Sequence, residues 1–137
     1  MKASDLPLTI PGIEPAIPVI AELVARGEIV AIILFGSVAR GQAREISDID
    51  ICIITRRGIP GPEKMELLSY GSDKIDVSIF EDLPITIRFR AIREGKILFC
   101  RDITALQAIM ADTVREYLDI APFIRRNCER ALGIGGG

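Results

Sequence analysis

The 137-residue sequence has no histidine and no tryptophan, and it has only two tyrosines and five phenylalanines. Without an imidazole group, the chain cannot build a Ser-His-Asp triad, a Cys-His pair or a histidine-ligated zinc site. Any acid–base or metal chemistry of this protein must therefore depend on carboxylates.

Cysteine is also scarce, and three residues of this type are spread widely along the chain: Cys52, Cys100 and Cys128. An odd number at such spacings favours neither a disulfide framework nor a metal site, and buried free thiols are the default expectation. The first residues lack the apolar stretch of a signal peptide, and no apolar run approaches the roughly 20 residues that span a bilayer. We therefore expect a soluble, cytoplasmic protein without a membrane partner.

The formal net charge is -2, so the chain lacks the basic excess that is typical of nucleic-acid binding. No direct contact with nucleic acid is expected. Apolar residues make up 49% of the sequence, which is enough for one ordinary core. We expect a single domain over residues 1–137, with a core over about 14–100 and C-terminal helices over about 104–132.

Hydrophobic periodicity predicts the order of the elements. Short apolar or alternating runs predict strands over residues 29–35, 48–55, 74–80 and 96–100. Helices are expected from about Pro15 to residue 25, over residues 84–94 with a cap near Asp82, and over residues 104–132 with a break near Pro122. Alternating strand and helix signals of this kind indicate an α/β (α+β) fold.

Three carboxylates carry the chemical signal. Asp48 and Asp50 are two residues apart on one strand, so their side chains share a face at about 6 to 7 Å, a spacing that suits a hard divalent cation. Asp76 lies in the middle of the strand at 74–80, where β-propensity disfavours aspartate, and pairing of the two strands would bring it beside the others. The alternatives are a solvated strand edge for the pair and a cross-strand ion pair for Asp76.

A glycine-serine step precedes the acids. An apolar strand breaks at Gly36, and residues 37–41 can open a short helix with Ser37 as its N-cap, which is an arrangement suited to phosphate. The segment is not a Walker A loop, because Gln42 and Ala43 replace the required lysine and hydroxyl residue. Arg40 is a candidate phosphate contact, although a solvent-facing arginine is the simpler interpretation.

The whole pattern resembles a known family. GSVARGQAREISDIDICII, with ten residues between Ser37 and Asp48, and the later KIDVSIF are similar to the minimal nucleotidyltransferases (MNT proteins) of the DNA polymerase β-like superfamily. The resemblance implies a nucleotidyltransferase fold, with a small mixed sheet that has helices on one side and a C-terminal helical segment. It also implies that Gly36 and Ser37 grip the phosphates of ATP.

The resemblance further implies roles for the acids and a partner. Asp48 and Asp50 would ligate Mg²⁺ (two ions are expected), and Asp76 would be the third metal-binding acid and the general base. MNT proteins resemble the antitoxins of HEPN/MNT pairs, which transfer AMP from ATP to a tyrosine of the HEPN toxin. Two alternatives stay open: a non-catalytic antitoxin that acts by binding, and transfer to a small-molecule acceptor. A homo-oligomer or hetero-oligomer is compatible with the sequence, which does not identify the acceptor.

Overall fold

The computed structural model describes residues 10–39, 41, 48–131 and 133 of the chain, without the side chains of residues 37 and 38. Four strands form its sheet: β1 (Ile29–Phe35), β2 (Ile49–Thr55), β3 (Ile75–Ile79) and β4 (Lys96–Cys100). The helices that surround the sheet are α1 (Ile17–Val24), α2 (Gly36–Ala39), α3 (Gly61–Leu68), α4 (Ile85–Glu94) and α5 (Ile103–Ala131), with short 3₁₀ turns η2 (Glu14–Ala16) and η3 (Phe80–Asp82). The expected strands are confirmed to within a residue or two at each end.

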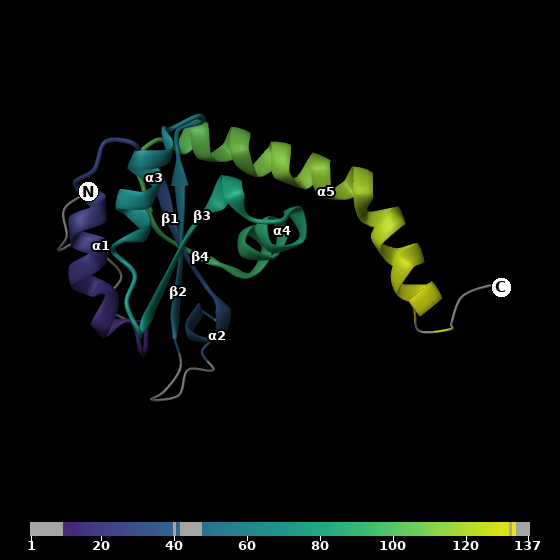
Figure 1. Cartoon of the computed structure of the whole chain (residues 1–137), viewed down its shortest axis with the longest axis horizontal. Coiled ribbons are helices and arrows are strands. Elements are labelled where there is room, and N and C mark those ends of the chain that lie inside the picture. The colour runs from purple at the N-terminus through teal and green to yellow at the C-terminus, as the bar shows by residue number, and fades with distance from the viewer. Residues whose placement is uncertain (1–9, 40, 42–47, 132, 134–137) are drawn as a thin grey trace.

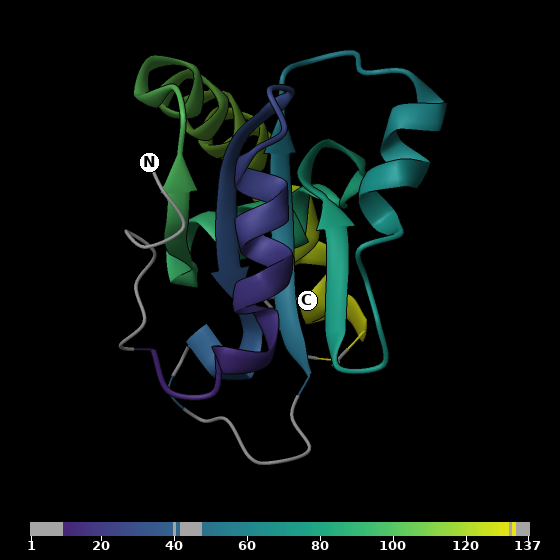
Figure 2. The ribbon, with the colours of Figure 1, turned by 90° about the vertical axis from the view of Figure 1, so that its left-hand side faces the viewer.

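The sheet is mixed, in the order β3-β2-β1-β4. Strand β1 pairs antiparallel with both of its neighbours, whereas β2 and β3 run parallel. A parallel pair needs a crossover connection, and α3 lies in the segment that joins the two strands, at the side of the sheet (Figure 2). The expected α/β fold with a small mixed sheet is confirmed.

Helices cover both faces of the sheet, so the expectation that they lie on one side was wrong. Helices α1 and α3 lie on one side of the sheet, and α4 and α5 lie on the other (Figure 1). The reason is visible in the two central strands, which are apolar at nearly every position. Because successive side chains point to opposite faces, such strands must be covered twice. The side chains divide into two clusters accordingly, one with Ile32 and Ile51, and one with Ile33 and Ile54.

Two local expectations were also wrong. Asp82 does not cap α4: the N-cap residue is Pro84, which makes no side-chain cap hydrogen bond, and Asp82 instead accepts a hydrogen bond from Lys64 at 2.9 Å. Pro122 does not break the last helix, because α5 runs through it to Ala131 and only curves (Figure 1). A proline removes one backbone hydrogen bond from a helix. Pro122 is exposed, so water can satisfy the carbonyl that is left free.

Arg101 connects three elements by hydrogen bonds to backbone oxygens. Its Nε donates to the carbonyl of Ile29 at 3.1 Å, and one terminal nitrogen donates to the carbonyls of Val24 at 2.5 Å and Arg26 at 3.1 Å. The last carbonyls of a helix have no partner within the helix. Arg101 therefore joins the end of β4 to the start of β1 and closes the end of α1.

In the part of the chain that the structure describes, no helix is both long and apolar enough to cross a membrane.

Gly95, where the backbone packs against α4 and β1, gives a test of the packing of the fold. A Cβ atom at Gly95 would lie 2.3 Å from the carbonyl oxygen of Ala91 and 2.5 Å from Cγ2 of Ile33. We expect Gly95→Ala to lower the free energy of unfolding by about 1 to 3 kcal/mol, as overpacking usually does. Urea denaturation measures the change.

The matched control is Gly27→Ala, since a Cβ at Gly27 meets nothing within 4 Å. Its effect should stay within about 0.5 kcal/mol. Equal losses in the two variants would contradict the packing of α4 and β4 against β1.

Candidate active site

The register of the parallel strands places two of the expected acids side by side. Asp50 of β2 pairs with Asp76 of β3, and Ile49 pairs with Ile75. Partners on adjacent parallel strands lie about 4.8 Å apart and point to the same face. Two like charges in this position lower the stability of the sheet. The pair therefore indicates a functional site that needs two neighbouring carboxylates.

The face that carries these acids is the one covered by α4 and α5. Cys52 follows Asp50 by two residues on β2 and belongs to the apolar cluster of that face. Its thiol is fully buried, and burial raises its pKa to about 12. Cys52 therefore forms part of the apolar floor beside the acids and is no thiolate nucleophile.

Asp48 lies immediately before β2 and is exposed, Asp50 is half-buried, and Asp76 is exposed. All three lie at the end of the sheet where β2 and β3 begin and β1 ends. Asp48 and Asp50 are two residues apart, which in extended chain places them on one face. The structure thus brings the three predicted acids to the same end of the sheet, with Asp50 and Asp76 on the same face.

Gly36 lies against this carboxylate set. Its predecessor Phe35 pairs with Asp50 across β1 and β2, and Gly36 itself has a φ of 79°. A Cβ at Gly36 would lie 2.1 Å from Oδ2 of Asp50. The backbone can turn into α2 this close to Asp50 only because glycine has no side chain and tolerates a positive φ.

This contact is what the sequence did not reveal. The resemblance assigns Gly36 to the phosphates, and nothing in the sequence spacing alone indicates that it also packs against Asp50. A glycine directly after a buried strand was the available signal, because such a position needs either a positive φ or close backbone approach.

The other predicted residues are only partly placed. Helix α2 begins at Gly36, one residue earlier than expected, so Ser37 is its second residue and not its N-cap. Its side chain is outside the described part of the chain, and so is Arg40. Their assignment to phosphate stays a prediction.

The carboxylates do not converge as they stand. Among the described residues, no three histidine, cysteine, aspartate or glutamate side chains are grouped so that they could hold a metal ion. Carboxylates without a cation between them repel, which favours side chains that point apart. The backbone register brings Asp50 and Asp76 together, and the oxygen donors are of the type that Mg²⁺ prefers.

The sequence is similar to that of a known protein. A curated protein of Methanocaldococcus jannaschii, which carries the provisional name protein adenylyltransferase, is 35% identical to this chain over 72 residues. The alignment covers 53% of this chain and 57% of the relative. The chain therefore spans little more than half the length of that relative.

Solved structures share the fold. The crystal structure of a toxin–antitoxin with AMP-PNP has a chain that superposes with a TM-score of 0.69 at 17% identity, over 87% of this chain and 98% of that one. A tri-AMPylated Shewanella oneidensis HEPN toxin in complex with its MNT antitoxin gives a TM-score of 0.60 at 16% identity, over 78% and 86% of the two chains. At these identities the likeness concerns the fold alone.

The sequence profile of the family described as "Polymerase beta, Nucleotidyltransferase" matches residues 19–104. This match covers more than half of the chain, from α1 to the start of α5, and includes the three acids and Gly36. The chain belongs to the polymerase β nucleotidyltransferase family.

Proposed function

We propose that this protein is a Mg²⁺-dependent nucleotidyltransferase that transfers AMP from ATP to a tyrosine hydroxyl of a partner HEPN-type toxin, and so acts as its antitoxin. The observation that carries the proposal is the pairing of Asp50 with Asp76, with Gly36 packed against Asp50. A stable sheet gains nothing from two carboxylates in register. Nucleotidyl transfer, in contrast, needs acids on a rigid support beside a backbone that a phosphate can approach.

Each acid has a role in this proposal. Asp48 and Asp50 would hold Mg²⁺, with Asp76 as the third ligand, and the family resemblance leads us to expect two ions. When bound, Mg²⁺ supplies neutralisation of the charge on the triphosphate. Asp76 stands on the exposed edge strand, where an acceptor can reach it.

The chain's own residues account for positioning and proton transfer. Gly36 leaves the end of β1 open to a phosphate, and Ser37 and Arg40 are the proposed phosphate contacts. The tyrosine oxygen forms a bond to the α-phosphorus of ATP. At the same time, the bond between the α-phosphorus and the oxygen that bridges it to the β-phosphorus breaks, and pyrophosphate leaves. Asp76 accepts the proton of the tyrosine hydroxyl. A carboxylate can perform this step without histidine once the acceptor is held beside it.

The named relatives support the choice of acceptor. One relative is called a protein adenylyltransferase, and one structure that shares the fold is a tri-AMPylated HEPN toxin in complex with an MNT antitoxin. A further structure of a toxin–antitoxin holds AMP-PNP, an ATP analogue. Together they favour ATP as donor and a protein as acceptor over transfer to a small molecule.

The acids are tested by transfer of label. With α-labelled ATP, Mg²⁺ and the product of the neighbouring gene, we expect label on the partner's tyrosine. Asp48→Ala and Asp76→Asn should each lower the initial rate at least about 100-fold, the size typical of losing one electrostatic contributor to a transition state. Asp73→Asn is the matched control, because Asp73 is exposed and lies just before β3.

Two outcomes would contradict the proposal. A tight complex without label would mean that the protein neutralises its toxin by binding alone. Label that persists in Asp48→Ala would mean that the acids are not the catalytic set.

Gly36 is tested by a second substitution. Gly36→Ala places a Cβ against Oδ2 of Asp50 and should displace this carboxylate, which lowers transfer by about 100-fold because small misplacements at a reacting centre are costly. The same labelling assay measures the loss, and far-UV circular dichroism checks the fold.

The control for Gly36→Ala is Gly41→Ala. Gly41 has a φ of 71°, close to that of Gly36, but none of the described residues has an atom within 4 Å of a Cβ placed there. This variant bears the same backbone strain without the contact, so its transfer rate should stay within a few-fold of the wild type. Equal losses in the two variants would show that backbone strain, rather than contact with Asp50, explains the effect.

A further inference from the structure

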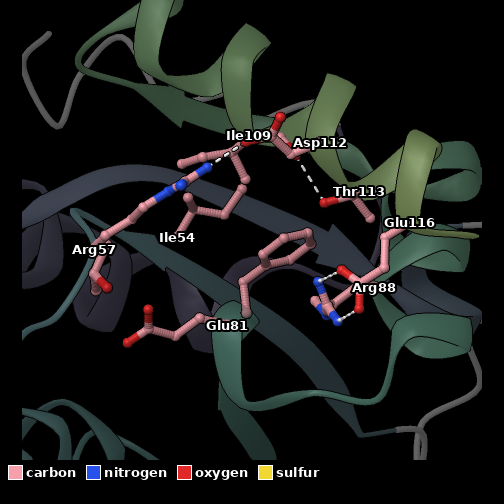
Figure 3. Close-up of a pocket in the computed structure, with 10 residues that line it drawn as sticks. Ile54, Arg57, Glu81, Arg88, Ile109, Asp112, Thr113 and Glu116 are labelled. Carbon is pink, nitrogen blue, oxygen red and sulfur yellow. Dashed lines mark hydrogen bonds and ion pairs between the residues drawn. The ribbon is translucent and has the colours of Figure 1, made fainter.

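A separate cavity opens at the other end of the sheet face that carries the acids. It has a volume of about 370 Å³ and lies between the end of β2, the turn η3, α4 and α5 (Figure 3). This volume is within the range of small-molecule sites, which begins near 300 Å³. None of the residues assigned to nucleotidyl transfer lines it.

The inner wall of the cavity is apolar. Ile54 and Phe80 are 1% and 3% exposed, and Ile109 of α5 packs against them from above. These three side chains belong to the same apolar cluster of the α4/α5 face. A ligand's hydrocarbon part would gain free energy by leaving water for this wall.

One side of the cavity is fixed by a forked ion pair. Both terminal nitrogens of Arg88 donate to the two carboxylate oxygens of Glu116, at 3.0 and 3.1 Å, and Nε donates to the carbonyl of Leu83 at 2.9 Å. Figure 3 shows this pair at the right of the view. These three hydrogen bonds hold the Arg88 guanidinium in place. Because its charge is neutralised by Glu116, this side of the cavity has no net charge.

A surplus positive charge lies at Arg57. Its guanidinium donates to Asp112, which also accepts from Arg115, so two cations share one carboxylate. Those two arginines hold the pKa of Asp112 below its usual value, Arg57 first. Because Asp112 keeps Arg115 when Arg57 turns away, the Arg57 side chain, which is 72% exposed, can engage a ligand without leaving a carboxylate unpaired.

A surplus negative charge lies at Glu81. Lys64 contacts Oε1 of Glu81 at 3.0 Å and Oδ1 of Asp82 at 2.9 Å, so here one cation is shared by two carboxylates. Glu81 lines the cavity, whereas Asp82 does not. If Glu81 turns to a cationic group of a ligand, Lys64 still has Asp82 as its partner. Glu81 can therefore bind a cation, just as Arg57 can bind an anion.

From this charge distribution we propose that the cavity binds an α-amino acid with an apolar side chain. The carboxylate of the ligand pairs with Arg57, its ammonium group pairs with Glu81, and its side chain lies on Ile54, Phe80 and Ile109. A simple anion such as phosphate fits less well, because Glu81 and Glu116 also line the cavity. A simple cation meets Arg57 and Arg88 in the same way, so the zwitterion is the ligand that satisfies both surplus charges.

Calorimetric titration of the full chain without nucleotide tests the site with three probes. L-leucine carries both charges, L-leucinamide lacks the carboxylate and N-acetyl-L-leucine lacks the ammonium group. We expect L-leucine to bind at least about tenfold more tightly than either analogue, since each loses one charge-assisted contact.

Substitutions assign each charge to its residue. In Arg57→Gln, L-leucine should bind as weakly as L-leucinamide, while the affinity for L-leucinamide itself stays unchanged. In Glu81→Gln, L-leucine should bind as weakly as N-acetyl-L-leucine. Arg125→Gln and Glu129→Gln are the controls, because they break another exposed ion pair, at 3.2 Å, that lies outside this cavity.

L-isoleucine and L-phenylalanine are titrated in the same way as L-leucine, and absence of binding by all three amino acids would overturn the proposal. So would binding of L-leucine that Arg57→Gln and Glu81→Gln leave unchanged. Both substituted side chains lie on the rim rather than in the core, so folded variants are expected. The result is independent of nucleotidyl transfer, because no nucleotide, metal or acceptor is present in the titration.

Discussion

The pairing of β1 with β2 is the constraint on which the rest of the molecule depends. Strand β1 is buried along almost its whole length and has a strand on each side, so its register cannot shift without exposing apolar side chains. That register sets Phe35 opposite Asp50, and the chain must then turn within one residue to begin α2. The site is therefore positioned by the most deeply buried strand of the fold.

The same constraint explains why the acids tolerate one another. Asp50 sits between β1 and β3, so its backbone is held by hydrogen bonds from both sides, whatever its side chain prefers. Repulsion between Asp50 and Asp76 is opposed by burial of their neighbours, Ile49, Ile51, Ile75 and Val77, each at most 8% exposed. A few apolar side chains of this kind contribute several kcal/mol together, whereas carboxylates near water repel much less strongly because the effective dielectric constant is high. The apolar core thus outweighs the cost of a charged edge.

The sequence predicted the strands well because each is a short apolar or alternating run, and β1, β2 and β3 are rich in β-branched residues. The family and the position of the acids followed from a motif whose parts are close in sequence, and the alternation of β2 and β3 already placed Asp50 and Asp76 on one type of face. The parallel register of these two strands could not be predicted in the same way, because it depends on the crossover connection through α3. Because β1 and β2 are apolar on both faces, their residues alone predict helices on both sides of the sheet. The wrong expectation of helices on one side came from the family resemblance.

What the sequence could not supply are contacts between distant, weakly patterned positions. A cap for α4 was expected at Asp82 or one of its neighbours, but Asp82 instead accepts a hydrogen bond from Lys64 of α3, eighteen residues earlier in the chain. The helical stretch was expected to break near Pro122. Local propensity does not reveal that Pro122 is exposed, so that water can satisfy the backbone there. The cavity is of the same kind, because its charged residues come from the end of β2, η3, α4 and α5 and share no common spacing in the sequence.

The two ends of the α4/α5 face are electrostatically separate, although they share their strands. Asp50 and Ile54 are four residues apart on β2, and so are Asp76 and Phe80 at the end of β3, which corresponds to about 13 Å of extended chain. The screening length at physiological ionic strength is about 8 Å, so charges at the acid end and at the cavity end influence each other weakly through solvent. Between them lies an apolar stretch that includes Cys52, whose raised pKa keeps it uncharged. Any influence of the cavity on the acids would therefore have to pass through the packing of β2 and β3, where Ile54 and Phe80 belong to the same buried cluster as Cys52.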